Sequence, residues 1–187
     1  MGTVRNFTHP NFIDYRILSA GLNHYESLGY SYREAPWVVS NEAIQVTLPP
    51  NRQAQTLPYG TLVGSAEQSF IELLMQGENV TKACAVTPCF RDESAYDVLH
   101  HAYFMKLELI HTDATVKNLK SMINDARAFF SQYLEVDVIK TGDNMYDIVD
   151  AQQGTELGSY GFRSFENVSF IYGTGVALPR LSTVLKG

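Results

Sequence analysis

Five charged residues stand in segments of the sequence whose other residues are mostly apolar: Arg91, Glu93, Glu108, Glu156 and Arg180. Charged side chains are rare in such segments unless they are paired or bind a ligand. Arginine forks bind phosphoryl oxygens and carboxylates bind Mg²⁺, so together these residues suit a site for phosphate and a metal ion. Any one of them taken alone also fits the solvent-exposed face of a strand.

A glycine-rich segment, Gly173-Thr174-Gly175, precedes Arg180. We expect a turn here that leads into a terminal helix, where backbone N–H groups would contact an anion. A lone GxG equally fits close packing of the backbone. The sequence contains no GxxxxGK[ST] phosphate-binding loop.

The first half of the chain must hold Arg91 and Glu108 in place. Apolar residues near helical spacing predict an amphipathic helix over residues 11–28, and prolines predict a loop over 48–59. A short strand over 61–64 and a helix over 67–76 follow. Residues 80–91 and 100–111 have a strong β pattern and predict an antiparallel pair that carries both charged residues.

The second half of the chain must hold Glu156 and Arg180. A 3-4 spacing of apolar residues predicts a helix over 115–133, with Asp113 as its N-cap. Strand patterns follow over 136–140, 146–151, 157–165 and 168–172. Hairpin-connected strands with helices to one side indicate an α+β fold in which helices flank an antiparallel β-sheet.

The composition is that of a folded domain. The 187 residues are 45% hydrophobic and 18% charged, which excludes a disordered or low-complexity chain, and we expect one domain over residues 1–187. The net charge of −6 argues against a protein that coats nucleic acid. Cys84 and Cys89 have no companion pair, so we expect two buried thiols and no disulfide framework or zinc knuckle.

No apolar run is long enough to cross a membrane, and the N-terminal residues lack the apolar stretch of a signal peptide. We therefore expect a cytoplasmic protein without a membrane partner.

Three segments resemble the sequence motifs of class II aminoacyl-tRNA synthetase catalytic domains. GYSYREAP at residues 29–36, after an amphipathic helix, resembles motif 1. CFRDE at 89–93 with HHAYFMKLE at 100–108 resembles motif 2, and GTGVALPRL at 173–181 resembles motif 3. The three segments occur in the family's order.

Two shorter matches strengthen the resemblance, which covers about residues 12–185. Ser65-Ala66-Glu67 is similar to the TxE element of seryl enzymes, and Glu156-Leu157-Gly158-Ser159 is similar to the E-x-x-S strand of seryl and pyrrolysyl enzymes. The stretch from Arg91 to Arg180 also resembles the pyrrolysyl and phenylalanyl core. The resemblance implies the class II fold with ATP and Mg²⁺ as cofactors, and leaves the subfamily open.

The resemblance implies roles in nucleotide binding for five residues. Arg91 would contact the α-phosphate and the substrate carboxylate, and would be catalytic together with Arg180, which would bind the γ-phosphate. Glu93 would accept a hydrogen bond from the adenine amino group, and Phe104 would stack on the ring. His100 would approach the γ-phosphate. A surface histidine pair and a solvent-facing helix arginine are the alternatives for His100 and Arg180.

The resemblance also implies a magnesium site and an amino-acid pocket. Glu156 and Ser159 would bind Mg²⁺ if a local bulge places them on one face. Ser65, Glu67, Glu108 and Ser159 would contact the substrate, with the carboxylates holding its ammonium group or its side chain. A solvated strand position is the alternative for Glu108.

We therefore expect an enzyme that uses ATP to convert an amino acid or related carboxylate into an acyl-adenylate and transfers the acyl group. The acceptor would be a carrier protein, a small amine, a modified nucleotide or a tRNA end. A chain of this length has no room for an anticodon-binding domain, and the short 94–99 turn argues against a standard tRNA synthetase. Departures from motif 3, at Ala177 and Pro179, leave Arg180 in place.

Two further expectations concern assembly and the loss of activity. Motif 1 is a dimer element in the family, and the apolar PWVV segment at 36–39 needs cover, so we expect a homodimer. The alternative function is a catalytically inactive, synthetase-like ligand-binding or regulatory subunit.

Overall fold

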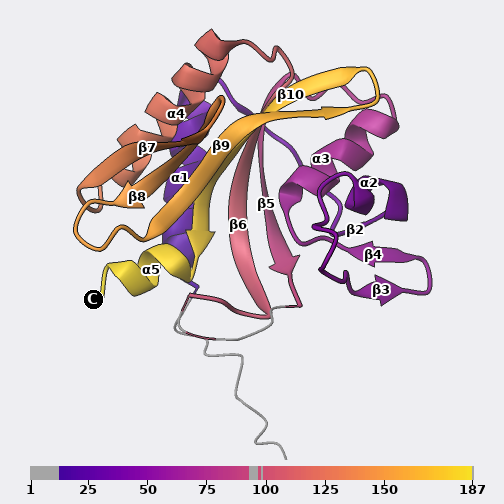
Figure 1. Ribbon diagram of the computed structural model, residues 1–187, viewed down its shortest axis with the longest axis horizontal. Helices are drawn as coiled ribbons and strands as arrows, with labels where there is room; N and C mark the ends of the chain where they lie inside the picture. The colour runs from indigo at the N-terminus through magenta and orange to yellow at the C-terminus, as the bar shows by residue number, and fades with distance from the viewer. Residues whose placement is uncertain (1–12, 93–96, 98, 187) are drawn as a thin grey trace, which may run out of the picture.

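A seven-stranded sheet forms the centre of the computed structural model, which describes residues 13–92, 97 and 99–186 (Figure 1). The strand order is β1-β5-β6-β10-β9-β8-β7, and a small sheet has the order β2-β4-β3. The helices are α1 (Tyr15–Ser27), α2 (Asn41–Gln45), α3 (Ala66–Met75), α4 (Val116–Phe130) and α5 (Arg180–Val184). The strands are β1 (Ser31–Tyr32), β2 (Val38–Val39), β3 (Thr56–Leu57), β4 (Gly60–Leu62), β5 (Lys82–Phe90), β6 (Tyr103–His111), β7 (Val136–Gly142), β8 (Met145–Asp150), β9 (Glu156–Phe165) and β10 (Val168–Leu178).

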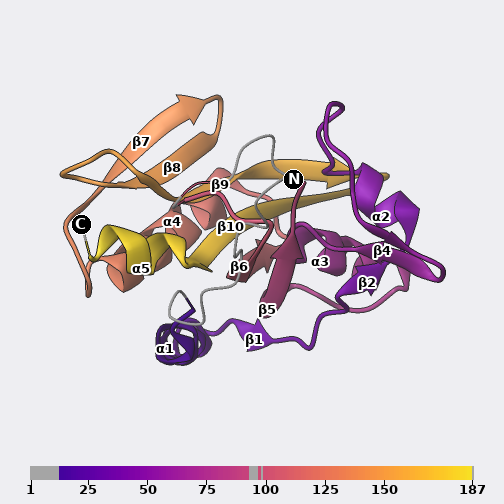
Figure 2. The same cartoon turned by 90° about the horizontal axis from the view of Figure 1, so that it is seen from below.

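The expected α+β class with an antiparallel sheet flanked by helices is confirmed, with one exception. Every neighbouring pair from β5 to β7 in the strand order is antiparallel. The two-residue β1 pairs parallel to β5, so the sheet is mixed at that edge. Figure 2 shows the β7–β8 hairpin at one end of the molecule and the small sheet at the other.

Helices α1 and α4 cover one face of the sheet. Leu18 and Tyr25 of α1 and Phe129 of α4 are buried in one core with Leu107 and Leu109 of β6. Helix α3 covers part of the opposite face, where Phe70 and Ile71 pack against β5. Because successive side chains of a strand point to opposite faces, residues 106 and 108 of β6 lie on the face that α3 covers only in part.

The segment Gly173–Gly175 belongs to β10, so the expected glycine-rich turn was wrong. Thr174 pairs with Glu108 and Val176 with Leu107, which leaves Gly175 as an extra residue in a β-bulge. A Cβ atom at Gly175 would overlap Leu107 and lie 2.9 Å from Tyr25 Cε2. Close packing against the helix-covered core therefore explains this glycine, and the helix that follows the strand is only the five-residue α5.

A second irregularity lies in β9. Ile148 of β8 pairs with Gly158 and Val149 pairs with Glu156, so Leu157 is the extra residue of a bulge. The bulge shifts the alternation of side chains and brings Glu156 and Ser159 to the same cavity. The bulge that the E-x-x-S resemblance required is therefore present.

Smaller differences concern element boundaries. Thr115 caps α4 by accepting a hydrogen bond from Asn118 N at 3.2 Å, whereas the expected cap, Asp113, accepts from the Asn118 side chain at 2.7 Å. The expected 48–59 loop contains β3, which pairs with β4.

Cys84 and Cys89 are buried free thiols, as expected. Within the described ranges, none of the helices combines the length and apolarity needed to span a membrane.

Candidate active site

Two adjoining cavities open on the face of the sheet that α3 covers only in part. The α3 cavity, of about 290 Å³, includes Ser65 and Glu67 at the start of α3. The α5 cavity, of about 340 Å³, includes Pro179 and Arg180 at the start of α5. The residues that line both cavities are Arg52, Arg91, Lys106, Ser159 and Thr174. A molecule in one cavity therefore lies against the same side chains as a molecule in the other.

The α5 cavity has a strong excess of positive charge. Its lining contains four cationic side chains, Arg52, Arg91, Lys106 and Arg180, and a single carboxylate, that of Glu156. Converging guanidinium and ammonium groups bind polyanions such as phosphate chains. The cavity thus has the charge pattern of a phosphate site although the whole chain carries a net charge of −6.

Arg91 stands directly after β5, between the two cavities. Its backbone N–H donates to the carbonyl oxygen of Ala102 at 2.9 Å, which prolongs the strand pairing. Its side-chain Nε donates to the carbonyl oxygen of Gly64 at 3.1 Å, and its Cζ lies 5.0 Å from the centre of the Phe104 ring. These contacts orient the guanidinium and leave its two terminal nitrogens without a partner in the described part of the chain.

Arg180 and Glu156 form an ion pair, with Nη1 3.1 Å from Oε1. Arg180 begins α5 and Glu156 begins β9, and both side chains line the α5 cavity. The alternative of a solvent-facing Arg180 does not hold, because its side chain is 24% exposed and paired.

Glu156 and Ser159 fit a magnesium ion that is shared with a phosphate chain. The residues that the structure describes contain no group of three or more His, Cys, Asp or Glu side chains able to hold a metal on their own. Mg²⁺ commonly takes one or two protein oxygens together with water and substrate phosphates. One carboxylate and one hydroxyl at the edge of a cationic cavity meet that description.

His100 lines the α5 cavity from the segment before β6. Its Nδ1 lies 2.9 Å from Asp97 Oδ1, and its side chain is 48% exposed. It is therefore a surface histidine at the mouth of the cavity, with an acidic neighbour. Glu93 lies outside the described residues.

Glu108 forms the floor of the α3 cavity. Its side chain is buried, so the alternative of a solvated strand residue was wrong. Ser65 Oγ donates to it at 2.7 Å, and Lys106 Nζ lies 2.5 Å from Oε1. Burial alone would raise the pKa of Glu108, but Lys106, Ser65 and Arg91 hold it below its usual value. The carboxylate is therefore charged at neutral pH.

Glu67 lines the same cavity, but its pKa is shifted in the opposite direction from that of Glu108. Its Oε1 accepts from Arg163 Nε at 2.6 Å, and its side chain is largely buried. Burial raises the pKa of Glu67 to about 7, against the lowering effect of Arg163. The nearby Glu108 carboxylate raises it further. We therefore expect the Glu67 carboxyl to titrate near neutral pH.

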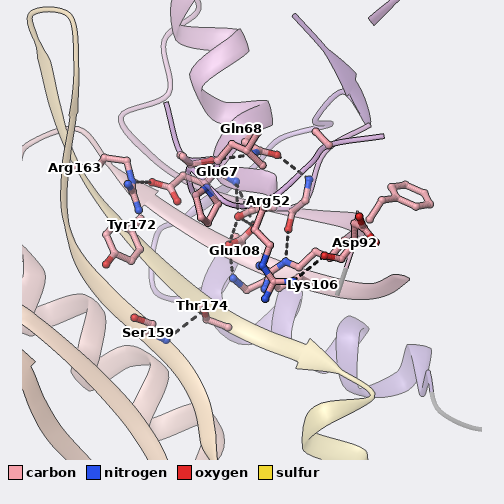
Figure 3. A pocket seen from close by; sticks show the side chains of 18 of the residues that line it. Arg52, Glu67, Gln68, Asp92, Lys106, Glu108, Ser159, Arg163, Tyr172 and Thr174 are labelled. Atoms are coloured by element: carbon pink, nitrogen blue, oxygen red, sulfur yellow. Dashed lines mark hydrogen bonds and ion pairs between the residues drawn. The ribbon is translucent and has the colours of Figure 1, made fainter. Parts of the chain in front are cut away.

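The structure adds site residues that the sequence analysis missed, namely Arg52, Lys106, Arg163, Tyr172 and Thr174 (Figure 3). A signal existed for two of them. Lys106 stands midway between Phe104 and Glu108, and Arg163 follows Ser159 by four residues, so strand alternation places each on the site face. Arg52 lies in a loop that has no periodic spacing of apolar residues. Its Nη1 donates to the carbonyl oxygen of Asp92 at 2.7 Å, a contact that no sequence pattern predicts.

Comparison with known proteins gives matches at the level of structure alone. No protein-family model and no curated protein sequence matches the chain. The solved structure of seryl-tRNA synthetase from Pyrococcus horikoshii complexed with ATP matches 92% of this chain, with a TM-score of 0.71 and 17% sequence identity. A pyrrolysyl-tRNA synthetase from Desulfitobacterium hafniense matches 92%, with a TM-score of 0.72 and 13% identity.

The fold is that of class II aminoacyl-tRNA synthetase catalytic domains. A serine-tRNA ligase from Naegleria fowleri in complex with AMP matches 89% of the chain, with a TM-score of 0.67 and 15% identity. The match covers 49% of the Pyrococcus chain, 46% of the Naegleria chain and 67% of the Desulfitobacterium chain. The chain thus spans about half the length of the seryl enzymes that it resembles.

Proposed function

We propose that this protein activates an amino acid or related carboxylic acid with ATP. A carboxylate oxygen attacks the α-phosphorus, the bond from that phosphorus to the pyrophosphate oxygen breaks, and acyl-adenylate and pyrophosphate form. The observation that carries the proposal is the pair of joined cavities, one strongly cationic and one with buried carboxylates, with Arg91 in the wall of both. The likeness of the fold to synthetases solved with ATP and AMP supports it.

The α5 cavity would hold the nucleotide. Phe104 lines this cavity and would stack on adenine. Arg180 would exchange Glu156 for the γ-phosphate, and Glu156 with Ser159 would take Mg²⁺. A bound Mg²⁺ neutralises charge on the phosphate chain. We keep Glu93 and His100 as proposed contacts of adenine and the γ-phosphate.

Arg91 would be the catalytic residue. Its terminal nitrogens can bind an α-phosphate oxygen and the reacting carboxylate at once, because a guanidinium presents several donors in one plane. Negative charge grows on the α-phosphate in the transition state, so the fixed guanidinium stabilises that state more than the ground state.

The α3 cavity would hold the acid, with Ser65, Glu67, Glu108 and Ser159 around it. The acyl group would then pass to a nucleophile. The acceptor classes remain a carrier protein, a small amine, a modified nucleotide and a tRNA end, and the names of the structural neighbours favour testing tRNA first.

The test is amino-acid-dependent exchange of pyrophosphate into ATP, with Arg91→Ala as the variant. We expect the exchange rate at saturating ATP to fall about 10²- to 10³-fold, by analogy with loss of one preorganised donor to a developing oxyanion. Arg91→Lys should rescue little, because an ammonium cannot replace a planar fork. Arg127→Ala on the exposed face of α4 is the matched control and should exchange at the wild-type rate.

A folded Arg91→Ala protein with near wild-type exchange would exclude the proposed role of Arg91. No exchange by the wild type with any amino acid or simple carboxylic acid, together with retained ATP binding, would instead favour the inactive ligand-binding subunit.

A further inference from the structure

Arg163 presents an oriented guanidinium at one end of the α3 cavity. Its Nε donates to Glu67 Oε1 at 2.6 Å, and its Cζ lies 5.1 Å from the centre of the Tyr172 ring. Figure 3 shows Arg163 beside Tyr172, at the end of the pocket away from Asp92. Of the five donors of a guanidinium, the contact with Glu67 uses one. The two terminal nitrogens have no hydrogen-bond partner among the described residues, so they form a fixed and available fork.

The two carboxylates beside Arg163 differ in what they can still bind. Both oxygens of Glu108 are engaged, since Oε1 accepts from Lys106 and Oε2 accepts from the backbone N–H of Glu67, and the single Ser65 hydroxyl lies 2.7 Å from both. Glu67 uses only Oε1, and its Oε2 accepts no hydrogen bond from the part of the chain that the structure describes. The α3 cavity thus offers one open anion-binding fork and one open carboxylate oxygen.

One cationic side chain of the α3 cavity is not shared with the α5 cavity. The lining of the α3 cavity contains Arg52, Arg91, Lys106 and Arg163, and the first three also line the α5 cavity, where the nucleotide would meet them. Arg163 lines the α3 cavity alone, so its open fork is left for the acid. A second carboxylate on the ligand would match that fork.

We propose that the acid activated at this site is an acidic α-amino acid, whose side-chain carboxylate binds the terminal nitrogens of Arg163 and whose ammonium group binds Oε2 of Glu67. The inference rests on the proposed function, in which the α-carboxylate of the substrate reacts at Arg91. It adds the substrate class and makes Arg163 the residue that selects it.

Discrimination against the corresponding amide follows from donor and acceptor chemistry. A carboxylate accepts two charge-assisted hydrogen bonds from a guanidinium fork. An amide of the same shape offers one acceptor and turns its NH₂ group toward the second donor. Hydrogen bonds to charged groups contribute about 1.5 to 3 kcal/mol, which converts to a preference for the acid of roughly ten- to a hundred-fold in Kd.

The test uses ligand pairs that differ only in this group: L-aspartate with L-asparagine, and L-glutamate with L-glutamine. Calorimetric titration of the full chain would contain Mg²⁺ and an ATP analogue with a methylene group between the α- and β-phosphates, which blocks the reaction. We expect one acid to bind at least about ten-fold more tightly than its amide. Arg163→Gln should bring the two Kd values within about two-fold, whereas Arg127→Gln on α4 should leave the preference intact.

Two further variants separate selection from a structural ion pair. Arg163→Gln leaves buried Glu67 without its partner, so the double variant Arg163→Gln, Glu67→Gln removes both charges and keeps the packing. It should fold and still lack the preference. Glu67→Gln alone should weaken both ligands of a pair and preserve their ratio, because Arg163 remains.

Each outcome is decisive. Equal or tighter binding of the amides by the wild type would overturn the inference, and pyrophosphate exchange with neutral amino acids would then leave the proposed function standing. Unchanged preference in a folded Arg163→Gln protein would also overturn it. Selective binding of an acid without exchange would support the substrate class and count against the activation reaction.

Discussion

The charged side chains of the candidate site are held in ion pairs that a substrate would rearrange. Arg180 pairs with Glu156, Arg163 with Glu67, and Lys106 with Glu108. A phosphate chain with Mg²⁺ could replace both halves of the first pair at once. In the third pair the carboxylate is enclosed by its own chain, so we expect it to persist when ligands bind.

Loss of the Arg180 side chain should weaken ATP binding selectively. A ligand at a hundred times its Kd stabilises the folded state by about 2.7 kcal/mol, or about 5 to 10 °C in Tm for a chain of this size. In Arg180→Ala we expect the shift with ATP and Mg²⁺ to fall to less than half. AMP lacks the γ-phosphate, so its smaller shift should be the same in both proteins. Differential scanning fluorimetry measures all four values, and equal ATP shifts would place Arg180 away from the phosphates.

The raised pKa of Glu67, about 7, makes the stability of the protein depend on pH. Between about pH 5 and 7 the folded protein keeps a proton that the unfolded chain has released, so the free energy of unfolding falls as pH rises. We expect the wild type to lose about 2 to 3 kcal/mol over this window relative to Glu67→Gln. Urea unfolding across the pH range measures this difference. Exposed Glu78→Gln should follow the wild type, and parallel curves for Glu67→Gln and wild type would contradict the assignment.

At the scale of elements, two β-bulges create the site face. The bulge at Leu157 brings Glu156 and Ser159 to one cavity, and the bulge at Gly175 changes the alternation between Thr174 and Ala177. Two buried tyrosine hydroxyls stabilise the second bulge. Tyr160 donates to the carbonyl oxygen of Thr174 at 2.6 Å, and Tyr25 donates to that of Gly175 at 2.9 Å.

Adding one methyl group at Gly175 should destabilise the fold. The new Cβ would overlap Leu107 and press on Tyr25, and insertion of extra volume into a packed core costs about 1 to 3 kcal/mol. Gly175→Ala should lower the free energy of unfolding by that amount in urea titration. In a Leu107→Ala background the penalty should shrink, since the clashing side chain is gone. An undiminished penalty in that background would mean that the cause lies in the backbone of the bulge.

At the scale of the whole molecule, large apolar side chains are exposed within the segment that resembles motif 1 and at its two ends. Leu28 is 39% exposed, Tyr32 48% and Trp37 54%. Val39 is covered within the chain, so only part of the PWVV segment needs a partner. Leu28 precedes β1, Tyr32 belongs to it and Trp37 follows it, so a second copy of the chain that packs along this strand would cover all three.

We therefore expect a homodimer of twice 21.0 kDa at micromolar concentration in multi-angle light scattering. Trp37→Ser should shift the mass toward that of the monomer, because large aromatic side chains contribute most to interfaces. Met145→Ser removes a comparably exposed apolar side chain from the β7–β8 hairpin and should leave the mass unchanged. A monomeric wild type would contradict the homodimer.

The sequence determined the elements whose signals are local. Periodicity located α1, α4 and the β5–β6 pair, since apolar spacing reflects which side of each element is buried. The residue types of Arg91, Glu108, Glu156 and Arg180 led to the prediction of a site for phosphate and a metal ion, and in the structure all four line the two joined cavities. Short elements such as α2 and β1 have no such spacing, because two to five residues do not complete a pattern.

Which charges face one another depends on contacts between elements that are distant in the sequence. The ion pair between Glu67 and Arg163 joins residues 96 positions apart, and the bulges that aim Glu156, Ser159 and Thr174 appear only when neighbouring strands are in register. The sequence also allowed a turn at Gly173–Gly175, whereas pairing with β6 and β9 places this segment in a strand. The pKa of Glu67 depends on burial and on charges from other strands, so spacing along one chain contains no information about it.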